Sequence, residues 1–220
     1  METLTAKQKQ YIEQPKERIT GSEAIVRCLL AEGVEVLYGY PGGAIMPVYD
    51  ELYKYEGEIN HVLTRHEQCA AHAAQGYARI SGKVGVAMAT SGPGATNLIT
   101  GIADAQIDST PMVCITGQVP SHLLGSDAFQ ETDIVGISTP VTKWNHQVTK
   151  ASQIPEIIAR AFYIARSGRP GPVLIDITKD AQFEEFDFEY KKCTGVRSYV
   201  PVPKTDEAAI SAAAEIINNA

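Results

Sequence analysis

Short apolar runs alternate along this chain with longer stretches whose apolar residues recur at helical spacing. The runs are too short for helices and mostly lack the polar alternation of a half-exposed strand, so they predict buried strands. Predicted strands cover 34–38, 60–63, 84–89, 112–116, 141–145 and 173–177. Predicted helices begin at Thr20 and further cover 44–53, 67–80, 95–107 and 154–167.

Regular alternation of strands and helices is typical of βαβ units on a parallel sheet, which is covered by helices on both faces. We therefore expect an α/β fold with an open, mostly parallel six-stranded sheet. The first helix carries a capping-box signal, in which Thr20 accepts from the backbone and Glu23 reaches back. Near the other end, the prolines of 199–203 predict an extended linker. A new helix opens at Thr205 and is only a few turns long at Ala220, so we expect a fragment of a longer protein.

Composition excludes several classes of protein. The net charge is −7 and the Lys and Arg residues form no block, which argues against nucleic-acid binding. The longest apolar runs are too short to cross a bilayer, and residues 1–15 lack the apolar region of a secretory signal. These features predict a cytoplasmic protein without a membrane partner. The four cysteines are widely separated, which indicates reduced thiols rather than disulfides or a metal site.

Candidate chemistry gathers where the predicted strands end, which is the edge at which open α/β sheets bind ligands. Three segments fall there: 40–44, 65–68 and the glycine-rich 91–97. The last of these precedes a helix, so it is open to two interpretations. One is anion binding by backbone N–H groups; the other is close packing of strand and helix, favoured because the spacing fits neither a dinucleotide fingerprint nor a P-loop.

Glu67 also has two interpretations. A carboxylate at a helix N-terminus is stabilised by the helix dipole, and that alone would explain it. A carboxyl group at the mouth of the sheet is also able to exchange a proton with a ligand. The neighbouring His66 and the strand-end Lys179 are more often ordinary solvated side chains. The long loop at 125–131 is of a kind that often carries function.

Six motifs occur along the chain in this order: 39–44, 65–68 with 76–79, 90–97, 115–120, 127–131 and 167–173. Together they resemble one family, the pyrimidine-binding domain of thiamine-diphosphate enzymes. The resemblance runs from about Thr20 to Asp180, and Phe129-Gln130 with Val119-Pro120 are similar to its acetohydroxyacid synthase (acetolactate synthase) branch. It implies a pyrimidine-binding domain at 20–190, an N-terminal extension at 1–19, and a linker at 191–220 that begins the central, FAD-associated domain.

The resemblance assigns a catalytic role to Glu67. In that family, a glutamate at this position hydrogen-bonds N1′ of the aminopyrimidine and favours the imino tautomer, through which the cofactor deprotonates its own thiazolium. The resemblance also places Gln130 near the reacting centre and implies that Arg169 touches a structural FAD. The other cofactor-binding residues implied are Tyr40, Gly43, Ala44, Pro93 and Asn97, and those of the substrate channel are Val119, Pro120, Phe129 and Lys179.

Part of such a site is missing from this sequence. The family holds the cofactor's diphosphate and Mg²⁺ on a Gly-Asp-Gly motif, and the sequence has no Asp-Gly pair. The resemblance implies that this motif lies in a further domain and that the site forms between two subunits. We therefore expect a homodimer or tetramer, a regulatory small subunit as a further partner, and a fragment that is inactive alone.

The function implied is carboligation of pyruvate with a second 2-ketoacid, pyruvate or 2-ketobutyrate. The products would be 2-acetolactate and 2-aceto-2-hydroxybutyrate, precursors of branched-chain amino acids. One alternative is another thiamine-diphosphate enzyme of the pyruvate oxidase or decarboxylase type. Another is a non-catalytic interaction domain with the same fold, because a fold does not fix a function.

Overall fold

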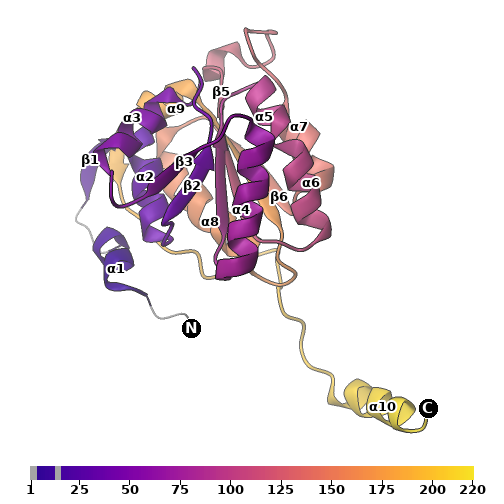
Figure 1. The fold of residues 1–220 in the computed structure, drawn as a ribbon. Coiled ribbons are helices and arrows are strands. Elements are labelled where there is room, and N and C mark those ends of the chain that lie inside the picture. Colours follow the sequence, from indigo (N-terminus) through magenta and orange to yellow (C-terminus); the bar gives the residue numbers. More distant parts are fainter. Residues whose placement is uncertain (1–3, 13–15) are drawn as a thin grey trace.

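A six-stranded, wholly parallel sheet forms the centre of the computed structural model, which describes residues 4–12 and 16–220 (Figure 1). Its strand order is β3-β2-β4-β5-β7-β6. The central strands β4, β5 and β7 are buried along their whole length, which explains their unbroken apolar sequences. The predicted fold class is thus confirmed, although the prediction of buried strands was wrong for β3 and β6, which lie at the two edges of the sheet and are largely not buried. The strands are β2 (Val36–Gly39), β3 (Asn60–Leu63), β4 (Gly85–Ala89), β5 (Met112–Gln118), β6 (Trp144–Val148) and β7 (Pro172–Thr178).

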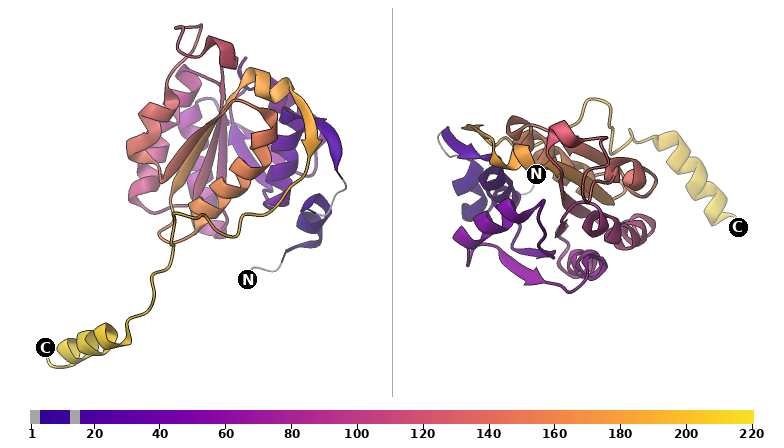
Figure 2. Two further views of the ribbon diagram at one scale, coloured as in Figure 1. Left: turned by 180° about the vertical axis from the view of Figure 1, so that it is seen from behind. Right: turned by 90° about the horizontal axis from the view of Figure 1, so that it is seen from above.

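Helices cover both faces of this sheet (Figure 2). Alternate strand residues point to opposite sides, so Val86 and Met88 join the core under α2 and α8, whereas Ala87 and Ala89 join the core under α4 and α6. The helices are α1 (Ala6–Ile12), α2 (Gly21–Ala31), α3 (Met46–Lys54), α4 (Glu67–Ser81), α5 (Pro93–Asn97), α6 (Ile99–Ile107), α7 (Ile134–Ser138), α8 (Ile154–Arg166), α9 (Lys179–Phe183) and α10 (Glu207–Asn218).

Small residues bring α4 close to the sheet. Its inner face consists largely of alanines, including Ala70, Ala71 and Ala74, all fully buried. A Cβ atom at Gly85 of β4 would lie 2.1 Å from the Ala74 carbonyl oxygen, so only glycine fits there. This close approach sets the position of α4 and hence of Glu67, its first residue.

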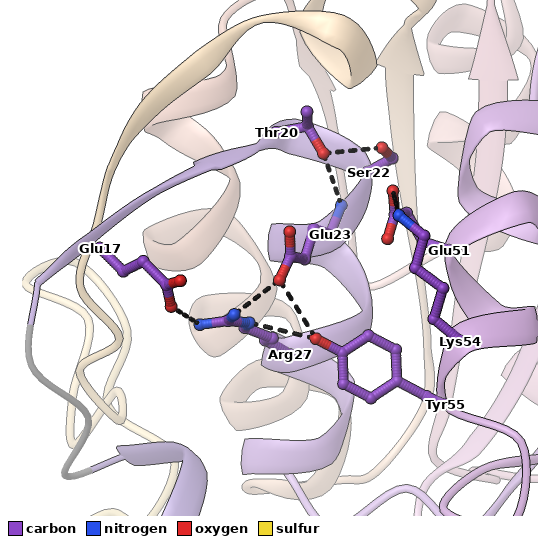
Figure 3. A network of polar contacts seen from close by, with 8 residues as sticks. All are labelled: Glu17, Thr20, Ser22, Glu23, Arg27, Glu51, Lys54 and Tyr55. Atoms are coloured by element: carbon purple, nitrogen blue, oxygen red, sulfur yellow. Dashed lines mark hydrogen bonds and ion pairs between the residues drawn. The ribbon is translucent and has the colours of Figure 1, made fainter.

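Half of the predicted capping box is confirmed. Thr20 Oγ1 accepts a hydrogen bond from the Glu23 amide at 3.2 Å. The Glu23 side chain does not reach back, and the prediction was wrong on this point. Its carboxylate instead binds Arg27 Nη2 at 2.6 Å and accepts from the Tyr55 hydroxyl, because a cation one helical turn away offers a stronger partner (Figure 3).

Two further predictions need correction. The helix predicted at 95–107 is two helices, α5 and α6, which meet at Leu98. The strand predicted at 141–145 begins later, at Trp144, because residues 139–141 form a 3₁₀ turn that includes Pro140. In addition, the segment 183–190, for which the sequence predicts no element, contains β8 (Glu185–Phe188), which pairs antiparallel with β1 (Glu17–Thr20) in a separate two-stranded sheet.

The two ends of the chain lie outside the predicted pyrimidine-binding domain. Residues 1–3 and 13–15 of the predicted N-terminal extension lie outside the described residues. At the other end, α10 is exposed along its whole length and lies away from the sheet (Figure 1). Among the described residues, no helix combines the length and the apolar character needed to cross a membrane.

Candidate functional site

A buried carboxylate lies at the carboxyl edge of the sheet, where α4 begins. Glu67 is only 7% exposed, and its Oε2 accepts a hydrogen bond of 2.9 Å from Asn97 Nδ2 at the end of α5. The preceding His66 caps the helix, since its Nδ1 accepts from the Gln68 amide at 3.2 Å. The structure thus brings together two of the three segments singled out by the sequence and gives His66 a local structural role.

The glycine-rich segment 91–97 lies against the free side of this carboxylate. A Cβ atom at Gly94 would lie 3.2 Å from Glu67 Oε1 and 2.8 Å from Thr90 Cγ2, so a side chain there would press on both. Pro93, in the same turn, is exposed, whereas Gly94 is buried. The glycine therefore leaves room beside Oε1, the oxygen that Asn97 does not bind.

The segment 40–44 is fixed beside this turn. The Ala44 amide donates to Thr90 Oγ1 at 3.1 Å, and the Ala44 carbonyl accepts from Gln182 Nε2 at 2.8 Å. Tyr40 and Gly43 of the same segment are exposed. The third segment from the sequence analysis therefore joins the first two, with exposed residues next to a fixed backbone.

We expect Gly117→Ala to destabilise the chain by about 2–4 kcal/mol. A Cβ atom there would lie 2.3 Å from the Ala44 carbonyl oxygen, which is backbone held by Gln182 and cannot yield cheaply. Urea-induced unfolding of the 220-residue chain measures the effect.

Gly76→Ala is the matched control. A Cβ atom at Gly76 meets nothing within 4 Å, and the residue lies inside α4, so the change is expected to stabilise the chain by about 0.5–1 kcal/mol. Equal effects of the two substitutions would contradict the steric argument.

The channel residues implied by the resemblance follow neighbouring strands at the same edge. Val119 follows β5 and Lys179 follows β7, and the last residues of these strands, Gln118 and Thr178, lie opposite each other. Val119 is buried and Pro120 half-buried. The structure therefore places Val119, Pro120 and Lys179 close together, beside the 40–44 segment.

Phe129 and Gln130 lie on the long loop after β5. Phe129 is 88% exposed, and Gln130 is exposed with a positive φ of 58°. A Cβ atom at Gly92 would lie 2.5 Å from the Gln130 carbonyl oxygen. The backbone of Gln130 therefore packs on the glycine-rich segment next to Glu67, although its side chain and that of Phe129 face outward in this chain.

Arg169 lies apart from the other candidate site residues. It precedes β7 and so stands at the amino edge of the sheet, opposite Glu67. Its guanidinium donates from Nε to Ser109 Oγ at 2.7 Å and from Nη2 to the Ile107 carbonyl at 3.0 Å. The structure does not bring Arg169 to the Glu67 group.

Several buried polar residues near the carboxyl edge of the sheet were not predicted from the sequence. Asp176 lies in the middle of β7 and is fully buried, and Gln182 is fully buried in α9. The signal was a lone carboxylate within the apolar run 173–177, because such a residue requires polar partners. Tyr49 was also missed: burial raises its pKa, and the nearby Glu67 carboxylate raises it further.

The fold and this edge define a class of cofactor-binding domain, and comparison with known sequences identifies its family. The family "Thiamine pyrophosphate enzyme, N-terminal TPP binding domain" matches residues 19–137, and the chain belongs to it. Thiamine pyrophosphate is another name for thiamine diphosphate.

Within this family, the chain is similar over most of its length to acetolactate synthases. The chain is 54% identical over 204 residues to the acetolactate synthase large subunit of Corynebacterium glutamicum, covering 93% of this chain and 32% of that protein. It is 51% identical over 211 residues to the acetolactate synthase of Arthrospira platensis, covering 94% and 36%. A probable acetolactate synthase large subunit of Methanocaldococcus jannaschii is 57% identical over 169 residues, covering 77% and 28%. The chain thus spans about a third of the length of the relatives it matches.

Proposed function

We propose that this chain is the cofactor-activating N-terminal domain of a thiamine-diphosphate-dependent acetolactate synthase. The whole enzyme would decarboxylate pyruvate and join the two-carbon unit to a second pyruvate or to 2-ketobutyrate. The observation that carries the proposal is the buried Glu67, held by Asn97 and flanked by a glycine that leaves one carboxylate oxygen free. The likeness to acetolactate synthases over most of this chain supports the choice of reaction.

The residues present suit the aminopyrimidine half of the cofactor. A ring nitrogen that shares a proton needs a carboxyl group that is largely shielded from water; Glu67 is 7% exposed, and among the described residues only its Oε2 is hydrogen-bonded, to Asn97. Thiamine diphosphate supplies, when bound, the carbon nucleophile that adds to the ketoacid carbonyl.

We propose a role for each of these residues at the carboxyl edge of the sheet. Glu67 holds and exchanges a proton at Oε1, and Asn97 fixes the orientation of the carboxylate through Oε2. Tyr40, Gly43, Ala44 and Pro93 border the cofactor on the neighbouring loops. We propose that four residues line the approach of the ketoacid, namely Val119, Pro120, Phe129 and Lys179, and that Gln130 lies near the reacting carbon in the assembled enzyme.

The remaining parts of the proposed enzyme lie outside this chain. Mg²⁺ and the diphosphate would bind a further domain of a second subunit, and FAD would bind mainly to the domain that follows residue 190. Arg169, at the opposite edge of the sheet, is the residue proposed to touch that FAD. The chain alone is therefore expected to be inactive, and a regulatory small subunit is a further proposed partner.

The outer face of α4 suits contact with a second copy. Cys69 and Gly76 are exposed on it, and Ile80 is 91% exposed. The adjacent edge strand β3 exposes Leu63. Exposed side chains along the helix that begins at Glu67 support association of two subunits through this domain, as a site shared between subunits requires.

A product assay tests the reaction. The full-length enzyme, supplied with thiamine diphosphate, Mg²⁺, FAD and pyruvate, is expected to release 2-acetolactate as its main product. Addition of 2-ketobutyrate should give 2-aceto-2-hydroxybutyrate as well. Free acetaldehyde or acetyl phosphate as the main product would instead indicate a decarboxylase or an oxidase of the same family.

A further inference from the structure

A fully buried carboxylate, outside the site described above, lies in the sheet next to the loop that follows β5. Asp176 Oδ1 accepts from Thr116 Oγ1 at 2.7 Å. Asp176 Oδ2 accepts from Gln118 Nε2 and from Gln147 Nε2, both at 3.0 Å. These donors come from β5 and β6, the two strands that flank β7, and all three are neutral.

One of these partners closes the loop of residues 119–133. Gln118 Nε2 also donates to the Thr132 carbonyl at 2.9 Å, and Gln118 Oε1 accepts from the Val119 amide at 2.9 Å. A single side-chain amide therefore joins the first residue of the loop to a residue near its end. Both amide hydrogens and the amide oxygen are used.

Asp176 acts with the Thr132 carbonyl and the Val119 N–H to determine which way this amide points. A carboxylate accepts but does not donate, so Nε2 must face Asp176 and Oε1 must face the Val119 N–H. A reversed amide would set its oxygen against the carboxylate and the Thr132 carbonyl, and its NH₂ against a donor. Buried pairs of like polarity of this kind are costly.

We propose that Asp176 is a positioning residue, which acts through the Gln118 amide to hold the 119–133 loop against the carboxyl edge of the sheet. The loop carries Pro120 at one end and Gln130 near the other, and the Gln130 backbone packs on Gly92. The structural part of this inference stands by itself, and its effect on the reaction rests on the proposed function.

The ionisation of Asp176 fits this role. Burial raises the pKa of Asp176 to about 6, the three hydrogen bonds oppose that rise, and the Asp133 carboxylate at the start of α7 adds to it. At neutral pH the group is mainly ionised and accepts from all three donors. Below about pH 6, a proton occupies one of the accepting positions and weakens the hold on Gln118.

Hydrogen exchange on the 220-residue chain tests the structural part. Asp176→Asn is expected to lower the protection factor of the Val119 amide about tenfold, because it weakens the hydrogen bond that orients the Gln118 side chain. Gln118→Met should have an effect of the same size, because it removes the oxygen that accepts from the Val119 amide. The double variant should show no additional loss. Gln147→Met is the control, because it removes a bond to Asp176 without touching Gln118, and should change the protection of Val119 less than about threefold.

Unchanged protection in Asp176→Asn, or additive losses in the double variant, would overturn the positioning role. If Asp176→Asn does not fold, the wild-type chain still decides, because the Val119 protection factor should fall between pH 7 and pH 5. A protection factor constant over that range would count against the proposal.

Steady-state kinetics on the full-length enzyme test the link to the reaction. Gln118→Met is expected to raise KM for the 2-ketoacid about tenfold and to lower kcat by a smaller factor, because the loop lines the approach of the substrate and does not include the proton-transfer group Glu67. Lost protection with an unchanged KM would keep the positioning role and overturn its bearing on substrate. A raised KM with intact protection would overturn the positioning role itself.

Discussion

Glu67→Gln in the full-length enzyme is expected to lower kcat for acetolactate formation by about 10²-fold or more. Glutamine has nearly the same shape and still accepts the Asn97 hydrogen bond, but its amide does not exchange a proton at the position of Oε1. The chain should remain folded, since Glu67 forms no salt bridge among the described residues. Initial rates at saturating pyruvate and cofactor measure the effect, with the circular dichroism spectrum as a check on folding.

Glu51→Gln is the matched control. Glu51 is also a helical glutamate with little exposure, but it pairs with Lys54 at 2.8 Å and lies on α3. Its replacement is expected to change kcat by less than about twofold. If Glu67→Gln retained full activity, the proton-transfer role would be excluded, and an interaction domain with the same fold would become the better interpretation.

Arg166→Met is expected to lower the free energy of unfolding by about 3–5 kcal/mol. The Glu32 side chain is fully buried, and its Oε2 lies 3.1 Å from Arg166 Nη1, while its Oε1 accepts from the Tyr190 hydroxyl. Removing the cation leaves a buried carboxylate without its charge partner. This group ties the ends of α2 and α8 to the chain after β8, so the loss falls on the whole domain. Urea-induced unfolding of the 220-residue chain at pH 7 measures it.

Arg18→Met serves as the control for this loss. The pair of Arg18 and Glu185 joins side chains that are 66% and 59% exposed, so water already screens it. Its removal should change the free energy of unfolding by less than about 1 kcal/mol. Equal losses in the two variants would show that burial of Glu32 does not matter for the fold.

Some elements of the fold were predicted correctly from the sequence, and others were missed. The strand at 60–63 and the helix from Glu67 were predicted almost to the residue, because hydrophobic period and capping are local properties. The break at Leu98 was missed because the apolar pattern runs through it without a glycine or proline at the break. The pairing of β1 with β8 was missed because it joins segments at opposite ends of the domain.

The sequence by itself determined the class of fold and the place of Glu67. Apolar runs of strand length require a doubly covered sheet, and a helix after a parallel strand starts at its carboxyl edge. Only the tertiary structure decided the partner of Glu67, the isolation of Arg169 at the opposite edge, and the hydrogen bonds of Asp176. These depend on strand order and register, which arise from packing among residues far apart in the chain, so no local pattern encodes them.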